Sequence, residues 1–87
     1  MEQEYIITVF SENKVGLLSQ LTAVFTCRDV NIESLTTAES ALQGIHKFTL
    51  VVRTTPDQVD KLGRQVEKKS DVLKTFVNKH DAVSYTE

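Results

Sequence analysis

The chain has 87 residues, of which 40% are apolar and 25% are charged, and its formal net charge at pH 7 is −2. This composition is typical of one small globular domain and argues against a disordered, fibrous or membrane-embedded protein. Charges of both signs are interspersed and no segment approaches the ~20 apolar residues that cross a bilayer, so nucleic acid and membranes are not expected partners.

The first half of the chain predicts a strand, a helix and a second strand. Residues 5–11 are β-branched and aromatic over a strand's length and end at a polar cluster. Residues 30–38 alternate largely between apolar and polar side chains, as a strand does. The helix between them should end near residues 27–29, where Asp29 takes a left-handed conformation. Its inward face recurs with the 3.6-residue spacing of a helix and comprises Leu17, Leu18, Leu21, Val24 and Phe25.

The second half predicts two further strands with a helix between them. Residues 45–53 alternate, and residues 72–77 supply the last strand. Residues 39–44 contain Ser40 and Gly44, which suits a hairpin that makes the two middle strands antiparallel, although their register stays open.

The helix in this half has a clear beginning. Thr55 can cap the free amide groups, Pro56 suits the first helical position, and Gln58 completes the spacing of a capping box. Gly63, in the middle of the helix, indicates close packing on the sheet. Both faces of the helix follow from the spacing, with Val59, Leu62 and Val66 inward and the pairs Asp57–Lys61 and Asp60–Arg64 outward.

The resulting order is βαββαβ, which predicts an α+β, ferredoxin-like fold. Right-handed crossovers on both helical connections place the two helices on one face of a four-stranded antiparallel sheet. We assign residues 1–79 to this domain and residues 80–87 to a C-terminal extension. That extension is either the start of a truncated region or the end of a short type of chain.

Two further expectations concern assembly and compartment. A domain of this length buries only about 60% of the surface that its unfolded chain exposes, which favours self-association. Cys27, the single cysteine, cannot form an internal disulfide, and residues 1–4 have neither the basic start nor the apolar run of a signal peptide. We therefore expect a cytoplasmic protein.

The ferredoxin-like plan serves many functions, so the sites must decide between them. Cys27, His46 and His80 have no partner at metal-ligand spacing, and a basic surface with exposed aromatic residues for RNA is not indicated. The sequence has no local signature of a nucleophile with its base, although convergence in space stays open. Ser11 and Glu12 are interpreted as turn-forming residues, His46 as lying on the exposed sheet face, and Cys27 as packing like a small apolar residue.

Residues 12–18 form the one segment that suggests a binding site, because they lead from the first strand into the first helix. Free amide groups and the positive end of the helix dipole favour a carboxylate there, and Gly16 lets a ligand approach the backbone. The alternative is that Asn13 is only a cap and Gly16 only eases a tight turn. On the binding hypothesis, Gly16→Asp abolishes amino-acid binding and leaves the domain folded.

Two stretches carry a resemblance to a known family. Residues 10–19 read Phe-Ser-Glu-Asn-Lys-Val-Gly-Leu-Leu-Ser and residues 28–36 read Arg-Asp-Val-Asn-Ile-Glu-Ser-Leu-Thr. Together they resemble the ACT domain of acetolactate synthase regulatory subunits. The second stretch is the more specific, whereas a loop of the Asn-x-x-Gly-x-Leu kind occurs across ACT domains. The resemblance extends from about residue 4 to residue 78.

The resemblance implies a feedback inhibitor, usually valine, bound between two ACT domains of a homodimer. The carboxylate and side chain of the ligand would lie on the loop and helix start of one chain, and its other side would contact the second chain. Carried onto this sequence, the first group is Asn13, Lys14, Val15, Gly16, Leu17 and Leu18, and the second is Asn31 and Ile32.

The same resemblance implies a non-catalytic regulatory subunit in branched-chain amino acid biosynthesis. Its partner would be the catalytic subunit of acetolactate synthase, to which thiamine diphosphate, FAD and magnesium would belong. No cofactor or metal is expected in this chain itself. The alternative reading is a free-standing ACT module that senses another amino acid, such as serine or glycine, or that acts only as a dimerisation domain.

Overall fold

The computed structural model describes residues 2–12, 16–42, 44–69 and 72–79 of the chain. Along the chain it contains β1 (Gln3–Glu12), α1 (Leu17–Cys27), β2 (Ile32–Glu39), β3 (Ile45–Thr54), α2 (Pro56–Glu67) and β4 (Val72–Lys79). The predicted βαββαβ order is therefore confirmed. The second strand begins at Ile32, two residues later than its alternating pattern predicts, and Val30 is instead a buried residue of the connection from α1.

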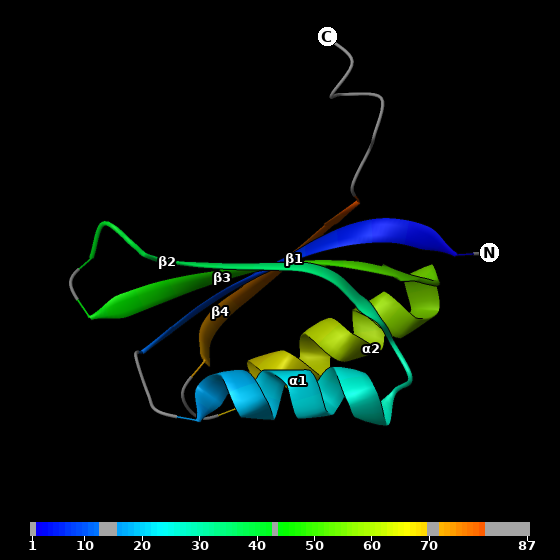
Figure 1. Ribbon diagram of the computed structural model, residues 1–87, viewed down its shortest axis with the longest axis horizontal. Coiled ribbons are helices and arrows are strands. Elements are labelled where there is room, and N and C mark those ends of the chain that lie inside the picture. The colour runs from blue at the N-terminus through cyan, green and yellow to red at the C-terminus, as the bar shows by residue number, and fades with distance from the viewer. Residues whose placement is uncertain (1, 13–15, 43, 70–71, 80–87) are drawn as a thin grey trace, which may run out of the picture.

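The four strands form one antiparallel sheet in the order β2-β3-β1-β4, and both helices lie along the same side of it (Figure 1). This confirms the ferredoxin-like fold. Tyr5 pairs with Val52 and Ile7 with Leu50, which fixes the register that the sequence leaves open. The order makes β2 and β4 the two edges of the sheet.

The core lies between the sheet and the helices, because alternate strand residues point to the same face. Ile7 and Val9 of β1 and Leu50 and Val52 of β3 are fully buried there. The helices meet them with Leu17, Leu21, Val24 and Phe25 of α1 and Val59, Leu62 and Val66 of α2. No described helix covers the opposite face of the sheet (Figure 1). On that face Phe10 and Phe76 pack edge to face with ring centroids 6.1 Å apart.

Three expectations for single residues are wrong. Leu18, expected on the inward face of the first helix, is 40% exposed. Cys27 is exposed at the end of α1, so it does not pack as a small apolar residue. His46 is half-buried and shares the helix-facing side of β3 with Phe48 and Leu50, because these residues are two apart in a strand.

The ends of the helices follow local signals. The Thr55 hydroxyl accepts a hydrogen bond from the Gln58 backbone N–H over 3.2 Å, and Pro56 opens α2, as predicted. The Gln58 side chain does not complete the predicted capping box, because it forms hydrogen bonds with Arg28. The predicted outer pairs also form, with 3.2 Å between Lys61 and Asp57. At the other helix, Asp29 follows the C-terminus with a φ of 58° and adopts the predicted left-handed conformation.

Gly63 is buried in α2, and a Cβ built on it would lie 3.0 Å from Cγ2 of Val77 in β4, which confirms the expected close packing on the sheet. We expect Gly63→Leu to lower the free energy of unfolding by about 1–3 kcal/mol, because the added side chain overfills this contact. Urea unfolding measures the change. Adding Val77→Ala should restore part of the loss, and an unchanged midpoint for Gly63→Leu alone would show that α2 and β4 separate without cost.

Candidate functional site

The start of α1 carries the first part of the predicted site. Gly16 precedes the helix with φ 90° and ψ −8°, it is exposed, and no side chain of the described residues caps the helix at this position. Its φ lies in the left-handed region, which glycine adopts without strain. Asn13, Lys14 and Val15, also predicted to bind the ligand, lie outside the described residues.

The positive φ of Gly16 changes one expectation drawn from the sequence. An aspartate at the N-cap of a helix would be tolerated if the backbone there had the usual extended conformation. In a left-handed conformation an L-residue costs about 1–2 kcal/mol, so Gly16→Asp would also weaken the fold. A Cβ at Gly16 meets nothing within 4 Å, so this cost comes from the backbone and not from a clash.

The two leucines after Gly16 have different environments. Leu17 is 1% exposed and belongs to the core, whereas Leu18 is 40% exposed. Only Leu18 of this pair therefore offers a substantial apolar surface to a ligand or to a second chain. Leu17 contributes indirectly, because its buried side chain packs in the core and holds the first turn of α1 against the sheet.

The second part of the predicted site lies after α1. Asn31 is exposed and Ile32 packs partly against the core. Asn31 borders a hollow of about 220 Å³ together with Thr26, Asp29 and Val30. A volume of this size is suited to a small ligand rather than to a large one.

Within one chain these two parts do not meet. Gly16 and Asn31 lie at opposite ends of α1, and an 11-residue helix is roughly 16 Å long. A ligand the size of an amino acid cannot span that distance. The structure thus brings Gly16, Leu17 and Leu18 together and brings Asn31 and Ile32 together elsewhere. A site that contained both groups would therefore require two copies of the chain.

Ser11, which the sequence suggests as a turn residue, instead lies within β1. Its side chain is fully buried, and its hydroxyl has no hydrogen-bond partner in the part of the chain that the structure describes. The residue lies next to the only break in the β1–β4 pairing, which shifts between Phe10 and Ser11 among the described pairs. Sequence alone gives no signal for this position, because Ser11 is one of several polar residues that end the strand pattern.

We expect Ser11→Ala to raise the free energy of unfolding by about 1 kcal/mol, because it removes a buried hydroxyl that is left without a partner. Chemical denaturation without ligand measures the effect. Thr75→Val is a second test of the same effect, since the Thr75 hydroxyl is also buried without a partner among the described residues. A clear loss of stability in Ser11→Ala would show that its hydroxyl is hydrogen-bonded in solution.

The described residues offer little for other chemistry. No group of three or more His, Cys, Asp or Glu side chains in residues 2–12, 16–42, 44–69 and 72–79 could hold a metal ion. In the same ranges, no helix is long and apolar enough to span a membrane. The candidate site among these residues is the exposed start of α1 at Gly16, and Asn31 is its predicted counterpart.

Comparison with known proteins identifies the family of the chain. Residues 7–74 match the family described as the AHAS small subunit-like ACT domain. The chain is 39% identical over 70 residues to the acetolactate synthase small subunit of Bacillus subtilis, covering 79% of this chain and 41% of the relative. It is 34% identical over 70 residues to the probable acetolactate synthase small subunit of Methanothermobacter thermautotrophicus, covering 80% and 42%.

A solved structure supports the same fold. The crystal structure of the acetolactate synthase small subunit from Thermotoga maritima superposes with a TM-score of 0.79 at 24% sequence identity, covering 86% of this chain and 47% of that one. At this identity the likeness shows the fold alone. The matched part is about two fifths of the length of the two relatives from Bacillus subtilis and Methanothermobacter thermautotrophicus.

Proposed function

The chain belongs to the family of AHAS small subunit-like ACT domains, and from this membership we propose that it is a valine-binding domain that mediates feedback inhibition of acetolactate synthase. In this role it performs no catalysis. It binds the end product of the pathway and changes the activity of a catalytic subunit. Thiamine diphosphate, FAD and magnesium belong to that catalytic subunit.

One observation carries the binding proposal, which is the open start of α1. In the part of the chain that the structure describes, the helix begins with no side-chain cap, because its N-cap residue is Gly16, and its first turn has no acidic residue. Its first amide groups and the positive end of its dipole are therefore available to an anion. Gly16 has no side chain to hold a ligand away from the backbone, so the carboxylate of an amino acid can reach these donors.

The order of the strands supports a site shared by two chains. Gly16 lies at the end of the sheet where β1 and β2 finish, and Asn31 lies at the end where β2 begins. In a two-fold pair joined by antiparallel β2 edges, the start of β2 in one copy lies beside the end of β2 in the other. This pairing brings Asn31 and Ile32 of one copy toward Gly16 of the other.

The edge strand itself favours this dimer. All residues of β2 after Ile32 are exposed, and the strand has no proline or lysine that would block pairing. The other edge, β4, carries Lys74 and Lys79, which are typical of an edge protected from association. Valine at the shared site then contacts both copies and links ligand binding to dimer geometry.

A thermal-shift screen across the twenty amino acids tests the ligand. Valine at ten times its Kd should stabilise the domain by about 1.4 kcal/mol, which for a domain of this size is roughly 6 °C or more in Tm. A larger shift with serine or glycine would favour the free-standing sensor, and no shift with any amino acid would favour a dimerisation domain.

A mixing experiment tests the partner. The chain alone should not convert pyruvate to acetolactate, whereas adding it to a matched catalytic subunit should change the rate or make it sensitive to valine. Regulation of this kind requires that valine bind one arrangement of the complex better than the other. A catalytic subunit that responds neither to the chain nor to the chain with valine would count against the proposal.

A further inference from the structure

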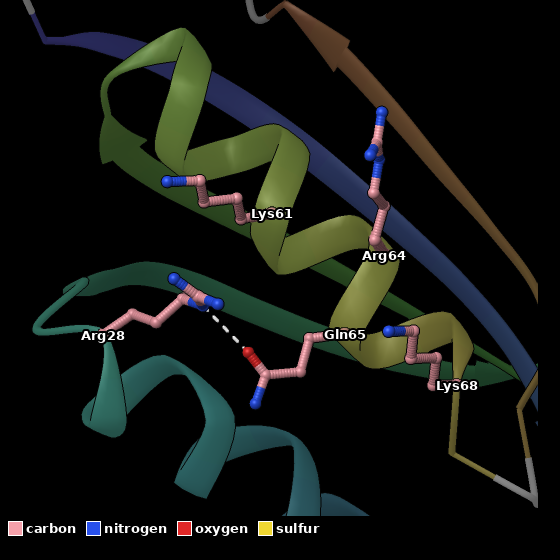
Figure 2. A pocket seen from close by; sticks show the side chains of 5 residues that line it. All are labelled: Arg28, Lys61, Arg64, Gln65 and Lys68. Atoms are coloured by element: carbon pink, nitrogen blue, oxygen red, sulfur yellow. Dashed lines mark hydrogen bonds between the residues drawn. The ribbon is translucent and has the colours of Figure 1, made fainter.

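A second hollow lies away from the start of α1, between the C-terminal end of α1 and the outer side of α2. Its volume is about 410 Å³, and four of the five residues that line it carry positive charge, although the whole chain has a net charge of −2. The lining residues are Arg28, Lys61, Arg64, Gln65 and Lys68. Figure 2 shows Arg28 reaching from the connection after α1 toward Gln65 on α2.

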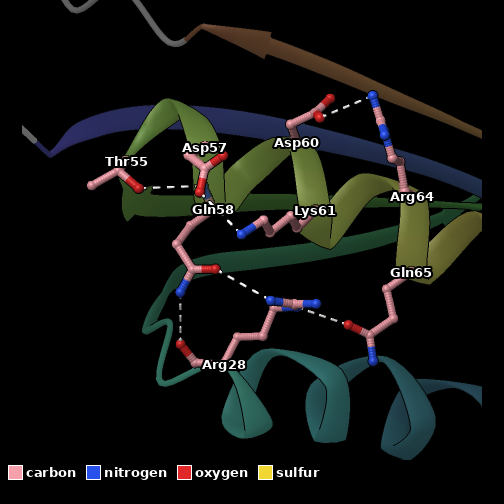
Figure 3. A network of polar contacts seen from close by, with 8 residues as sticks. All are labelled: Arg28, Thr55, Asp57, Gln58, Asp60, Lys61, Arg64 and Gln65. Carbon is pink, nitrogen blue, oxygen red and sulfur yellow. Dashed lines mark hydrogen bonds and ion pairs between the residues drawn. The ribbon is translucent and has the colours of Figure 1, made fainter.

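Arg28 is held in place by neutral groups. Its Nε donates a hydrogen bond to Oε1 of Gln65 over 2.8 Å, and its Nη1 donates to Oε1 of Gln58 over 3.4 Å (Figure 3). Gln58 also donates from Nε2 to the Arg28 carbonyl oxygen over 3.3 Å. The cap at Thr55 fixes Gln58 in turn, because it binds the backbone N–H of the same residue. Arg28 is thus oriented in advance of any ligand.

These contacts leave the charge of Arg28 without a balancing carboxylate among the described residues. A guanidinium group has five N–H donors, and the two glutamines accept from only two of them. The remaining donors keep the planar fork that matches a phosphate or carboxylate group. Its position is fixed by the hydrogen bonds, so less side-chain entropy is lost when an anion binds.

The other three cationic side chains of the hollow differ in whether a carboxylate pairs with them. Lys61 pairs with Asp57, and Arg64 pairs with Asp60, each over 3.2 Å. Figure 2 shows the Arg64 guanidinium turned away from Arg28, so it contributes mainly its stem to the wall. Lys68 has no carboxylate partner in the part of the chain that the structure describes. Among the described residues, two positive charges of the hollow, on Arg28 and Lys68, therefore have no paired carboxylate.

We propose that this hollow binds a small ligand with a multivalent phosphate group. A fixed arginine fork beside an exposed lysine is suited to a phosphate with several negative oxygens, since the fork orients the group and the ammonium adds a point charge. The concave shape and the volume of about 410 Å³ favour a small molecule over the flat surface of a protein partner. The hollow lies within one chain, so it does not depend on the dimer or on valine.

The test is calorimetric titration of the 87-residue chain with inorganic pyrophosphate at low ionic strength, where charge interactions are screened least. We expect saturable binding that Arg28→Gln weakens about tenfold, because a charge-assisted hydrogen bond is lost, and that Lys68→Gln weakens about threefold, as for an exposed charge. Citrate serves as the carboxylate counterpart and should bind more weakly.

Lys47→Gln is the matched control, because Lys47 is exposed in β3 on the face of the sheet without helices and the change removes the same charge. It should bind pyrophosphate as the parent chain does. An equal loss in Lys47→Gln and Lys68→Gln would show a response to net charge only and would overturn the proposal. Absence of saturable heat with pyrophosphate would also overturn it. Thermal melts of Arg28→Gln check that this variant is folded. If Arg28→Gln unfolds, the loss of pyrophosphate binding in Lys68→Gln tests the proposal instead.

Discussion

Gly16→Asp is expected to abolish valine binding and to lower the free energy of unfolding by about 1–2 kcal/mol. The new carboxylate would lie at the open start of α1, where it would occupy the donors that we assign to the ligand's carboxylate. It would also repel that carboxylate in a partly desolvated site. The loss of stability comes from the φ of 90° at Gly16, which an L-residue adopts at a cost.

Gly44→Asp separates the loss of valine binding from the loss of stability. Gly44 has a φ of 84°, is exposed, and has no atom within 4 Å of an added Cβ, so the strain and the charge change match those at Gly16. Circular dichroism melts should show a similar loss in both variants, while calorimetry with valine should show undiminished binding in Gly44→Asp alone. Retained valine heat in Gly16→Asp would remove the start of α1 from the site.

The sequence predicts α2 and the order of elements well because their signals are local. The cap at Thr55, Pro56 and the charge pairs four residues apart all act within one or two turns, and the structure confirms each of them. The register of the sheet could not be predicted in this way. It depends on pairs such as Ile7 with Leu50, which are distant in sequence and are selected by packing between layers.

The site is harder to predict because it too depends on contacts between residues that are distant in sequence. The 3.6-residue pattern places Leu17 and Leu18 on one broad stripe, but neighbouring residues in a helix point about 100° apart, and only Leu17 reaches the core. Arg28 shows the limit most clearly. Its two glutamine partners are 30 and 37 residues away, so a turn residue of the first helix becomes part of a cationic hollow only when α2 packs beside it.

If the dimer forms through β2 as proposed, Leu35→Lys should yield a monomer that valine no longer stabilises. Leu35 lies near the middle of β2 and is 37% exposed on the edge of the sheet. Near a two-fold axis a residue faces its own copy, so the substitution would place two ammonium groups close together. Like charges facing each other in an interface cost several kcal/mol, which corresponds to a dimer at least about 100-fold weaker.

Leu73→Lys is the control for this change, because Leu73 is 50% exposed in β4, the opposite edge of the sheet. Sedimentation velocity at tens of micromolar should show a dimer for the parent chain and for Leu73→Lys, and a monomer for Leu35→Lys. If valine binds between two copies, the thermal shift must vanish together with the dimer. A Leu35→Lys monomer that valine still stabilises would place the whole binding site within one chain, and a dimer that survives this substitution would place the interface away from β2.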